Sequence, residues 1–289
     1  MAKKKTTKLK SLSQGRPPTI KPQKRSISSK ATRTLIRTHH TLEKQKAKAL
    51  ADGDITKAAV IAKQIEQQGG IESYQRASLT GQTKERGGDS SRILMEWLEP
   101  VVPVLKDLAT NGQAARLLEV GALSVSNACS KSRLFDVERI DLNSQAEGIK
   151  QQDFMERPLP QDEKEKFDVV SLSLVLNYVP DPFGRGKMLL RTLTFLKAAS
   201  PSEALATFLP SLFLVLPAPC VTNSRYMDEA KLESIMRSLG YTEVKKKLSN
   251  KLVYYLWRKS APKPQKTISF KKEELRSGGT RNNFAIVLK

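Results

Sequence analysis

The sequence predicts an α/β protein, built as a doubly wound, mostly parallel sheet with an N-terminal helical extension. Between residues 115 and 217, apolar runs of strand length alternate with segments of helical composition such as "GRGKMLLRTLTFLKAAS". The runs are nearly continuous in Val, Ile and Leu, which is typical of strands buried on both faces of a parallel sheet. Right-handed crossovers then place a ligand crevice at the carboxyl ends of the strands.

Positive charge is concentrated at the two ends of the chain. The net charge is +21, and residues 1–50 hold fifteen Lys or Arg against one acid, Glu43. Residues 245–289 hold thirteen against two acids, whereas residues 51–244 carry a net charge of −4. Basic ends favour a polyanionic partner, because Lys and Arg that neutralise phosphates release condensed counterions. Residues 1–30 lack the apolar content to fold, so we expect a disordered basic tail there.

Composition argues against several other classes of protein. The longest apolar runs are strand-sized and far short of the roughly 20 residues that span a bilayer, so we expect no membrane association. The polar, lysine-rich N-terminus has no apolar signal region. Two cysteines and two histidines are too few and too scattered for a zinc module, so we expect no metal.

The N-terminal unit, residues 31–90, is expected to be a helical hairpin followed by a polar loop that faces the cofactor or RNA. Apolar residues at helical spacing predict a first helix up to residue 51, and Asp54 is positioned to cap a second. The loop is rich in Gly, Ser, Gln and Arg; it is either a linker or a cover for a polar ligand. The residues favouring a cover are Tyr74, Arg76 and Arg86.

The catalytic unit, residues 91–289, is expected to begin with a helix capped by Ser90 or Ser91 and continued, with a bend at two prolines, toward Leu108. Strands and helices then follow in order. We expect strands at 115–121, 137–142, 167–179 and 211–217, helices at 184–200 and 228–241, and closing strands within 241–259 and at 282–288.

Three segments at the predicted crevice suit a nucleoside cofactor. Glu119 and Gly121 end the first strand, and Gly121 allows close approach of the backbone. Asp141 follows Gly121 by 20 residues, where a carboxylate accepts hydrogen bonds from a ribose diol. Asp153 is placed to accept an adenine amino proton, with Phe154 covering the base. Since later glycines of a pyrophosphate loop are absent, this constellation indicates S-adenosylmethionine rather than a dinucleotide.

A second motif, "LVLNYVPDPFGRG" at residues 174–186, follows the strand that lies next to this crevice. Asn177 has an amide that both donates and accepts, Tyr178 offers a ring for a flipped base, and Pro180 holds backbone carbonyls outward. The alternative is an ordinary turn in which Asp181 caps the next helix. We expect Asn177, Tyr178 and Pro180 to form the acceptor site.

The segments "RGGDSS", "LLEVGAL", "RIDLNS", "LNYVPDPFGRG" and "RNNFAIVL" together resemble the fungal nucleolar 25S ribosomal RNA adenine-N1 methyltransferases. The resemblance covers roughly residues 20 to 289. It implies a class I methyltransferase (Rossmann-like) fold, S-adenosylmethionine as methyl donor, and an adenine of large-subunit rRNA or a pre-ribosomal particle as acceptor. Gly121 and Asp141 match the family's motif glycine and ribose acid.

The resemblance also implies a protein of the nucleus and nucleolus, and we expect a monomer. The "EVGAL" turn departs from the ExGxGxG of class I methyltransferases in general but resembles this family's own form. Animal relatives are S-adenosylmethionine sensors, so an interaction protein that binds the cofactor without methyl transfer is the alternative function.

Overall fold

The computed structural model describes residues 29–70, 72–73, 88–144, 146–198, 202–260 and 269–289. The predicted tail up to residue 28 lies outside the described residues, as do Tyr74, Arg76 and Arg86. The predictions for these residues therefore stay predictions.

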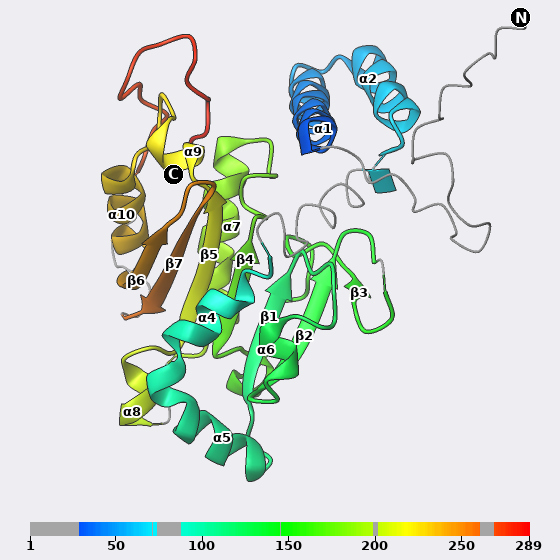
Figure 1. The fold of residues 1–289 in the computed structure, drawn as a ribbon. Coiled ribbons are helices and arrows are strands. Elements are labelled where there is room, and N and C mark those ends of the chain that lie inside the picture. The colour runs from blue at the N-terminus through cyan, green and yellow to red at the C-terminus, as the bar shows by residue number, and fades with distance from the viewer. Residues whose placement is uncertain (1–28, 71, 74–87, 145, 199–201, 261–268) are drawn as a thin grey trace, which may run out of the picture.

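A seven-stranded sheet forms the centre of the molecule (Figure 1). Its strands follow the order β3-β2-β1-β4-β5-β7-β6, and β3, β2, β1, β4 and β5 are mutually parallel. β7 runs antiparallel to both of its neighbours. The bounds are β1 Ala115–Val120, β2 Phe135–Asp141, β3 Lys150–Gln151, β4 Val169–Ser173, β5 Ser211–Pro217, β6 Tyr241–Leu248 and β7 Leu252–Lys259.

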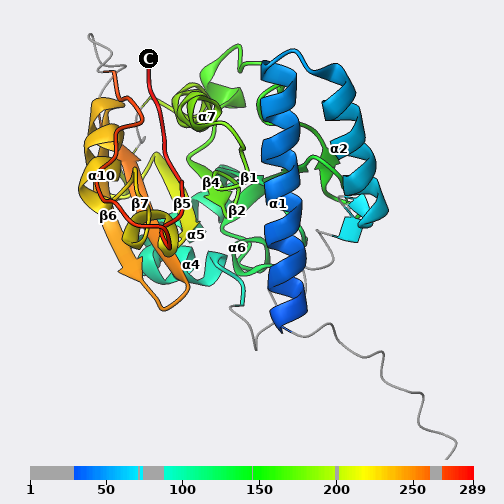
Figure 2. The ribbon, with the colours of Figure 1, turned by 90° about the horizontal axis from the view of Figure 1, so that it is seen from above.

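Helices cover both faces of this sheet (Figures 1 and 2). One face carries α4 (Ser91–Trp97), η2 (Glu99–Val101), α5 (Val102–Thr110) and α6 (Ala128–Lys131); the other carries α7 (Pro182–Phe195) and α10 (Glu229–Ser238). The short elements η3 (Glu163–Glu165), α8 (Glu203–Ala206) and α9 (Pro219–Thr222) lie in connections. The doubly wound, class I methyltransferase fold expected from the sequence is therefore confirmed.

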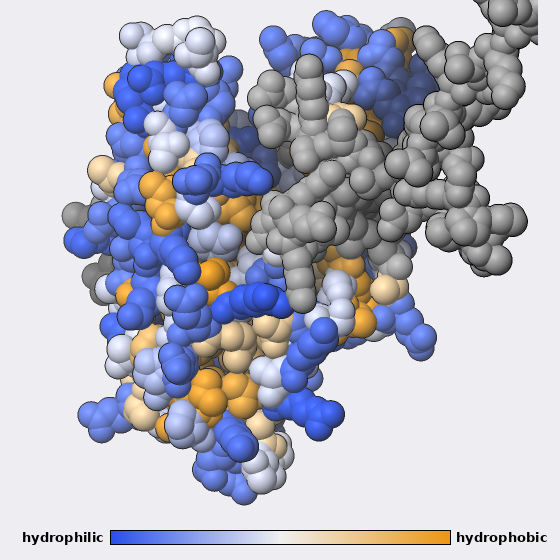
Figure 3. Space-filling model, viewed as in Figure 1, coloured by the Kyte–Doolittle hydropathy of each residue, from blue (hydrophilic) through white to orange (hydrophobic). Residues whose placement is uncertain are grey.

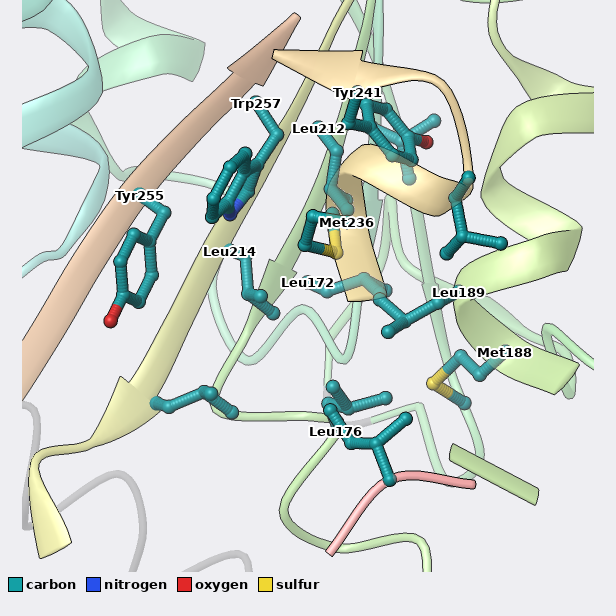
Figure 4. Packing of buried hydrophobic residues seen from close by; sticks show 14 of the residues in the cluster. Leu172, Leu176, Met188, Leu189, Leu212, Leu214, Met236, Tyr241, Tyr255 and Trp257 are labelled. Atoms are coloured by element: carbon teal, nitrogen blue, oxygen red, sulfur yellow. The ribbon is translucent and has the colours of Figure 1, made fainter. Parts of the chain in front are cut away.

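Alternate residues of the strands fill the two cores. In β5, Leu212 and Leu214 belong to the cluster beneath α7 and α10, whereas Phe213 and Val215 belong to the cluster beneath α4 and α5. Figure 4 shows the first cluster, in which Trp257 and Tyr255 of β7 lie beside these leucines. Both aromatic side chains are buried and belong to the core. This apolar layer supports the ends of the strands where the predicted site lies.

The N-terminal hairpin has the helices that the sequence predicts. α1 spans Ser29–Ala51 and α2 spans Ile55–Gln67, and the Asp54 carboxylate accepts a hydrogen bond from the Lys57 amide. The buried residues of α2 are Ala58, Ile61 and Ile65, whereas Ile55 at its start is 75% exposed. Both ribbon views place the hairpin beyond the carboxyl ends of β1 and β2 (Figures 1 and 2).

Two predictions of extended structure are wrong. β4 ends at Ser173 rather than at residue 179, because Leu174 has a φ of 58° and a turn follows it; among residues 174–179 only Leu176 is buried. Residues 282–288 form no strand of the sheet. Most side chains of residues 284–288 are buried, but the backbone bonds elsewhere: the Val287 amide, for example, donates to the carbonyl of Pro182 at 3.0 Å. An apolar pattern alone does not reveal which partner satisfies the backbone.

The face seen in Figure 3 is hydrophilic over β6 and α10, while hydrophobic residues gather over α4. Lys245, Lys246 and Lys247 on β6 are exposed, as the predicted basic rim requires. Lysines on an edge strand also oppose pairing with another sheet.

Candidate active site

Strand register brings Gly121 and Asp141 side by side at the crevice. Val120 is paired with Ile140, so Gly121, just after β1, lies next to Asp141, the last residue of β2. The amides of Gly121 and Ala122 both donate to the Ile140 carbonyl, at 2.8 and 3.1 Å. This pair of bonds turns the chain sharply after β1 and fixes the position of the glycine relative to the acid.

Glycine is required at position 121 by its backbone and by its surroundings. Its φ of +74° lies in the left-handed region, and an added Cβ would lie 2.6 Å from Cγ2 of Val175. Val175 belongs to the segment after β4. The turn after β1 and the predicted acceptor loop are therefore in direct contact at this residue.

The two aspartates lie at the same end of the sheet. Oδ1 of Asp141, at the end of β2, accepts from the Asn143 amide at 2.9 Å. Asp153 comes two residues after β3, and its Oδ1 accepts from the Met155 amide at 2.7 Å. Both carboxylates order the turn that follows their strand, which is where carboxyl-end ligand sites of such sheets are built.

Phe154 does not have the position expected of a residue that covers a base. Its ring is 2% exposed and packs against Phe195 of α7, with centroids 5.2 Å apart. The sequence could not distinguish these roles, because an aromatic residue after an acid fits either. In the structure Phe154 contributes to the core beneath the crevice rather than to its surface.

Glu119 is enclosed behind the β1 turn. Both carboxylate oxygens accept from Nδ2 of Asn127 at 2.7 Å, and Asn127 also caps α6. Desolvation, with a smaller contribution from the nearby Asp89 carboxylate, raises the pKa of Glu119 to about 7 against the lowering effects of Asn127 and Arg139. Glu119 is therefore partly protonated near neutral pH.

Asp89 was missed by sequence reasoning, although "RGGDSS" contains it. Its Oδ1 accepts from the amide and hydroxyl of Ser91 at 2.9 and 2.7 Å, and its Oδ2 accepts from the Ala128 amide at 2.5 Å. Ser90 is the N-cap residue of α4, as predicted, but its side chain makes no capping hydrogen bond, and Asp89 binds the first-turn amide of Ser91 instead. Ser90 is hydrogen-bonded to Ser173, at the end of β4, at 2.8 Å.

The end of β4 and the start of α6 are thus tied to one short segment. Residues 89–91 contact the end of β4 through Ser90 and the start of α6 through Asp89. The signal in the sequence was an Asp two residues before an apolar helix, which is a strong capping residue.

The loop after β4 holds an unsatisfied polar atom. Oδ1 of Asn177 is buried and has no hydrogen-bond partner among the described residues. The Tyr178 amide donates to the Val175 carbonyl at 2.9 Å, which closes a tight turn around Asn177. Since a buried acceptor without a partner costs free energy, an orphaned atom of this kind suits a ligand that donates to it.

Arg185, also missed, holds this loop from behind. Its side chain is 1% exposed, and its guanidinium donates to the carbonyls of Val179, Ala285 and Pro180 at 2.9, 2.6 and 3.4 Å. Burial lowers its pKa to about 10, so it stays charged at neutral pH. Arg185 therefore joins the "NYVPDP" loop to the C-terminal segment.

Asp181 caps α7, because its Oδ2 accepts from the Gly184 amide at 2.7 Å. The alternative interpretation of this motif thus holds for Asp181. Asn177, four residues earlier, takes no part in this cap.

Comparison with known proteins identifies the family. Residues 59–286 match the family described as 25S rRNA (adenine(2142)-N(1))-methyltransferase, Bmt2. The chain belongs to this family. A 25S rRNA adenine-N(1) methyltransferase of Schizosaccharomyces pombe is 44% identical over 253 residues, covering 87% of this chain and 89% of that protein. The 25S rRNA (adenine(2142)-N(1))-methyltransferase of Saccharomyces cerevisiae is 40% identical over 254 residues, covering 86% and 70%.

Two solved structures are only distantly similar to this chain of the Bmt2 family. A Burkholderia thailandensis 1,6-didemethyltoxoflavin-N1-methyltransferase with bound S-adenosylhomocysteine has a TM-score of 0.41 and 14% identity, covering 65% of this chain and 87% of that one. The 16S rRNA methylase RmtB has a TM-score of 0.33 and 14% identity, covering 78% and 75%. At these scores neither structure bears on ligand or substrate.

Proposed function

We propose that this chain is an S-adenosyl-L-methionine-dependent methyltransferase that methylates N1 of an adenine in large-subunit (25S) rRNA during ribosome biogenesis. The observation that carries this function is membership of the Bmt2 family, with 44% identity across nearly the whole length of a relative named for that activity. The crevice at Gly121 and Asp141 and the buried Oδ1 of Asn177 supply the two halves that the reaction needs.

The residues at the carboxyl ends of β1 and β2 fit the cofactor. A backbone turn with no side chain at Gly121 leaves room for close approach, and the adjacent Asp141 suits a ribose diol. We assign cofactor contacts to Gly121 and Asp141, with Asp153 toward the adenine amino group and Glu119 behind the turn. S-adenosylmethionine, when bound, supplies an electrophilic methyl group.

Adenine N1 carries an in-plane lone pair, so its methylation requires no side chain to remove a proton. The work left to the protein is orientation of the base, exclusion of water and stabilisation of a ring that becomes cationic. Oδ1 of Asn177 is an acceptor suited to the N6 amino group of the base, and Tyr178 offers a ring on which the base stacks. Pro180 stiffens this loop, and the buried Arg185 binds the carbonyls of Val179 and Pro180 from the protein interior.

The expected acceptor is large-subunit rRNA or a pre-ribosomal particle, and the expected location is the nucleus, in the nucleolus. The net charge of +21, concentrated at both ends of the chain, supports a polyanionic partner. No helix in the described part of the chain is long and apolar enough to cross a membrane. Within the same residues, no three His, Cys, Asp or Glu side chains gather as metal ligands. We expect the enzyme to act as a monomer.

The test is methyl transfer from labelled S-adenosylmethionine to 25S rRNA by the wild type and by Asp141→Ala, with cofactor affinity measured separately by calorimetry. We expect label in the RNA with the wild type, and weakened cofactor binding together with loss of label in the variant. Tight cofactor binding without transfer to RNA or to pre-ribosomal particles would contradict the proposal and favour the cofactor-sensing alternative.

A further inference from the structure

A cluster of two lysines and one phenylalanine lies next to the acceptor loop. The ammonium nitrogen of Lys187 is 4.6 Å from the ring centroid of Phe183, and that of Lys289 is 5.1 Å from the same centroid. Both lysines are exposed and the ring is partly exposed. Two positive charges from distant parts of the sequence are therefore held at one aromatic side chain.

The cluster is built into the fold rather than assembled by chance contact of flexible ends. The Val287 amide donates to the Pro182 carbonyl at 3.0 Å, and Arg185 donates to the Ala285 carbonyl at 2.6 Å. A Cβ on Gly186 would lie 1.9 Å from the Val287 oxygen, so the two backbones are in direct contact. This docking against the first turns of α7 brings Lys289 to Phe183.

No carboxylate side chain of the described residues is paired with the two ammonium groups of the cluster. The nearest acid along the chain, Asp181, caps α7 through the Gly184 amide. Like charges held together disfavour one another, and an anion placed between them relieves that repulsion.

Phe183 of the cluster follows the Asn177 loop directly in the sequence, which indicates the class of anion. Residues 177–183 run continuously from the acceptor loop into α7, and an added Cβ on Gly184 would lie 3.0 Å from Cγ1 of Val179. An adenine turned into the loop leaves its own backbone phosphates at the rim of the site. Lysine is a common phosphate ligand in such positions, and phosphate contacts fix the register of a nucleic acid.

We propose that Lys187 and Lys289, gathered by Phe183, bind a backbone phosphate of the RNA next to the target adenine. The inference rests on the proposed function and adds a binding site to it. The cluster orients the strand, and the Asn177 loop receives the base.

The test compares the affinity of full-length variants for a fluorescent 25S rRNA fragment containing the target adenine, across a series of salt concentrations. Lys187→Ala/Lys289→Ala removes both charges, whereas Lys187→Arg/Lys289→Arg keeps them. The matched control, Lys106→Ala/Lys164→Ala, removes two exposed lysines at the opposite end of the molecule. Figure 1 shows α5, which carries Lys106, at that end.

We expect the alanine pair to lower the slope of log affinity against log salt by about 0.7, since one phosphate contact with a single strand contributes about that much. The corresponding loss of affinity is up to roughly 5-fold at 0.1 M salt. The arginine pair should bind like the wild type, and the control pair should lose less than the alanine pair.

Equal slopes for the alanine pair and the control pair would overturn the proposal. So would a loss of inorganic phosphate binding with unchanged RNA affinity, because the cluster would then bind free phosphate. RNA binding is measured without methyl transfer, so a wild type that binds but transfers nothing would contradict the proposed function and leave the comparison of variants readable. Cofactor affinity, measured for each variant, checks that the fold is intact.

Discussion

Two features of the structure require glycine at position 121: its φ is +74°, and the Val175 side chain occupies the space beside it. Gly121→Ala should lower the free energy of unfolding by about 2 kcal/mol, of which about 1 comes from the left-handed backbone. Val175 is β-branched and stiff, so relief of the overlap must move its backbone. Urea unfolding measures the loss, and calorimetry measures the accompanying fall in S-adenosylmethionine affinity.

A second variant separates the two causes. In a Val175→Ala background, Cγ2 is absent, and Gly121→Ala should then cost at least about 0.5 kcal/mol less than in the wild type. An equal cost in both backgrounds would show that contact with the acceptor loop plays no part.

Glu119 provides a prediction about pH. Its pKa of about 7 in the folded protein lies above the ordinary value of 4.5, so the folded state binds the proton more tightly than the unfolded state. The free energy of unfolding should therefore fall as pH rises from about 4.5 to about 7, by on the order of 2 kcal/mol. Urea unfolding of the wild type and Glu119→Gln at pH 5 and pH 8 tests this.

Glu119→Gln has no carboxylate to ionise at this position. Relative to this variant, the wild type should therefore be less stable at pH 8 than at pH 5. Parallel profiles for the two proteins would mean that this carboxylate is charged throughout the range. Any acid that titrates equally in both proteins cancels in the comparison.

Among the elements, the acceptor loop depends on α7 through Arg185. Lysine cannot reach the carbonyls of Val179 and Ala285 with the same fork of donors, so Arg185→Lys should release the loop. We expect kcat for RNA methylation to fall roughly 10- to 100-fold because the base is displaced by about an ångström, with cofactor affinity unchanged.

The matched control is Arg116→Lys. Arg116 also donates to two carbonyls, those of Lys164 and Lys166, at 2.7 and 3.2 Å, but at the opposite end of β1. Both variants should lower the melting temperature, and only Arg185→Lys should lower kcat. If the two variants had similar kcat values, Arg185 would have no specific role in positioning the acceptor loop.

Elements with a strong local pattern could be predicted from the sequence. β5 has the predicted bounds, Ser211–Pro217, because a strand buried on both faces is uniformly apolar. α10 was predicted from its apolar spacing, and Gly240, with a φ of +87°, follows its end as expected. Asp141 was placed correctly at the end of β2 for the same reason, since strand ends follow from pattern and spacing.

Elements that depend on partners remote in sequence could not be predicted. Asp89 reaches Ala128 across 39 residues, and Arg185 reaches Ala285 across 100. Neither contact leaves a local pattern, so both residues read as ordinary surface polar groups. Phe154 was misplaced because burial of a ring depends on packing by α7 rather than on its neighbours in the chain.

At the scale of the whole molecule, basic segments surround a nearly neutral catalytic core. α1 and α2 lie beyond the carboxyl ends of β1 and β2 (Figure 2). Partial desolvation lowers the pKa of Lys44 on α1, and the charge of Arg185 lowers it too. The hairpin, the loop and the C-terminal segment thus form one side of the molecule, where we expect the RNA to bind.

The most direct test of this account maps the methylated nucleotide. Wild type and Asn177→Ala are incubated with S-adenosylmethionine and 25S rRNA, and N1-methyladenine is located by the arrest of reverse transcription. The account predicts arrest at one adenine with the wild type, and loss of that arrest in the variant while cofactor affinity is unchanged. Undiminished arrest in Asn177→Ala, or no arrest with the wild type, would contradict it.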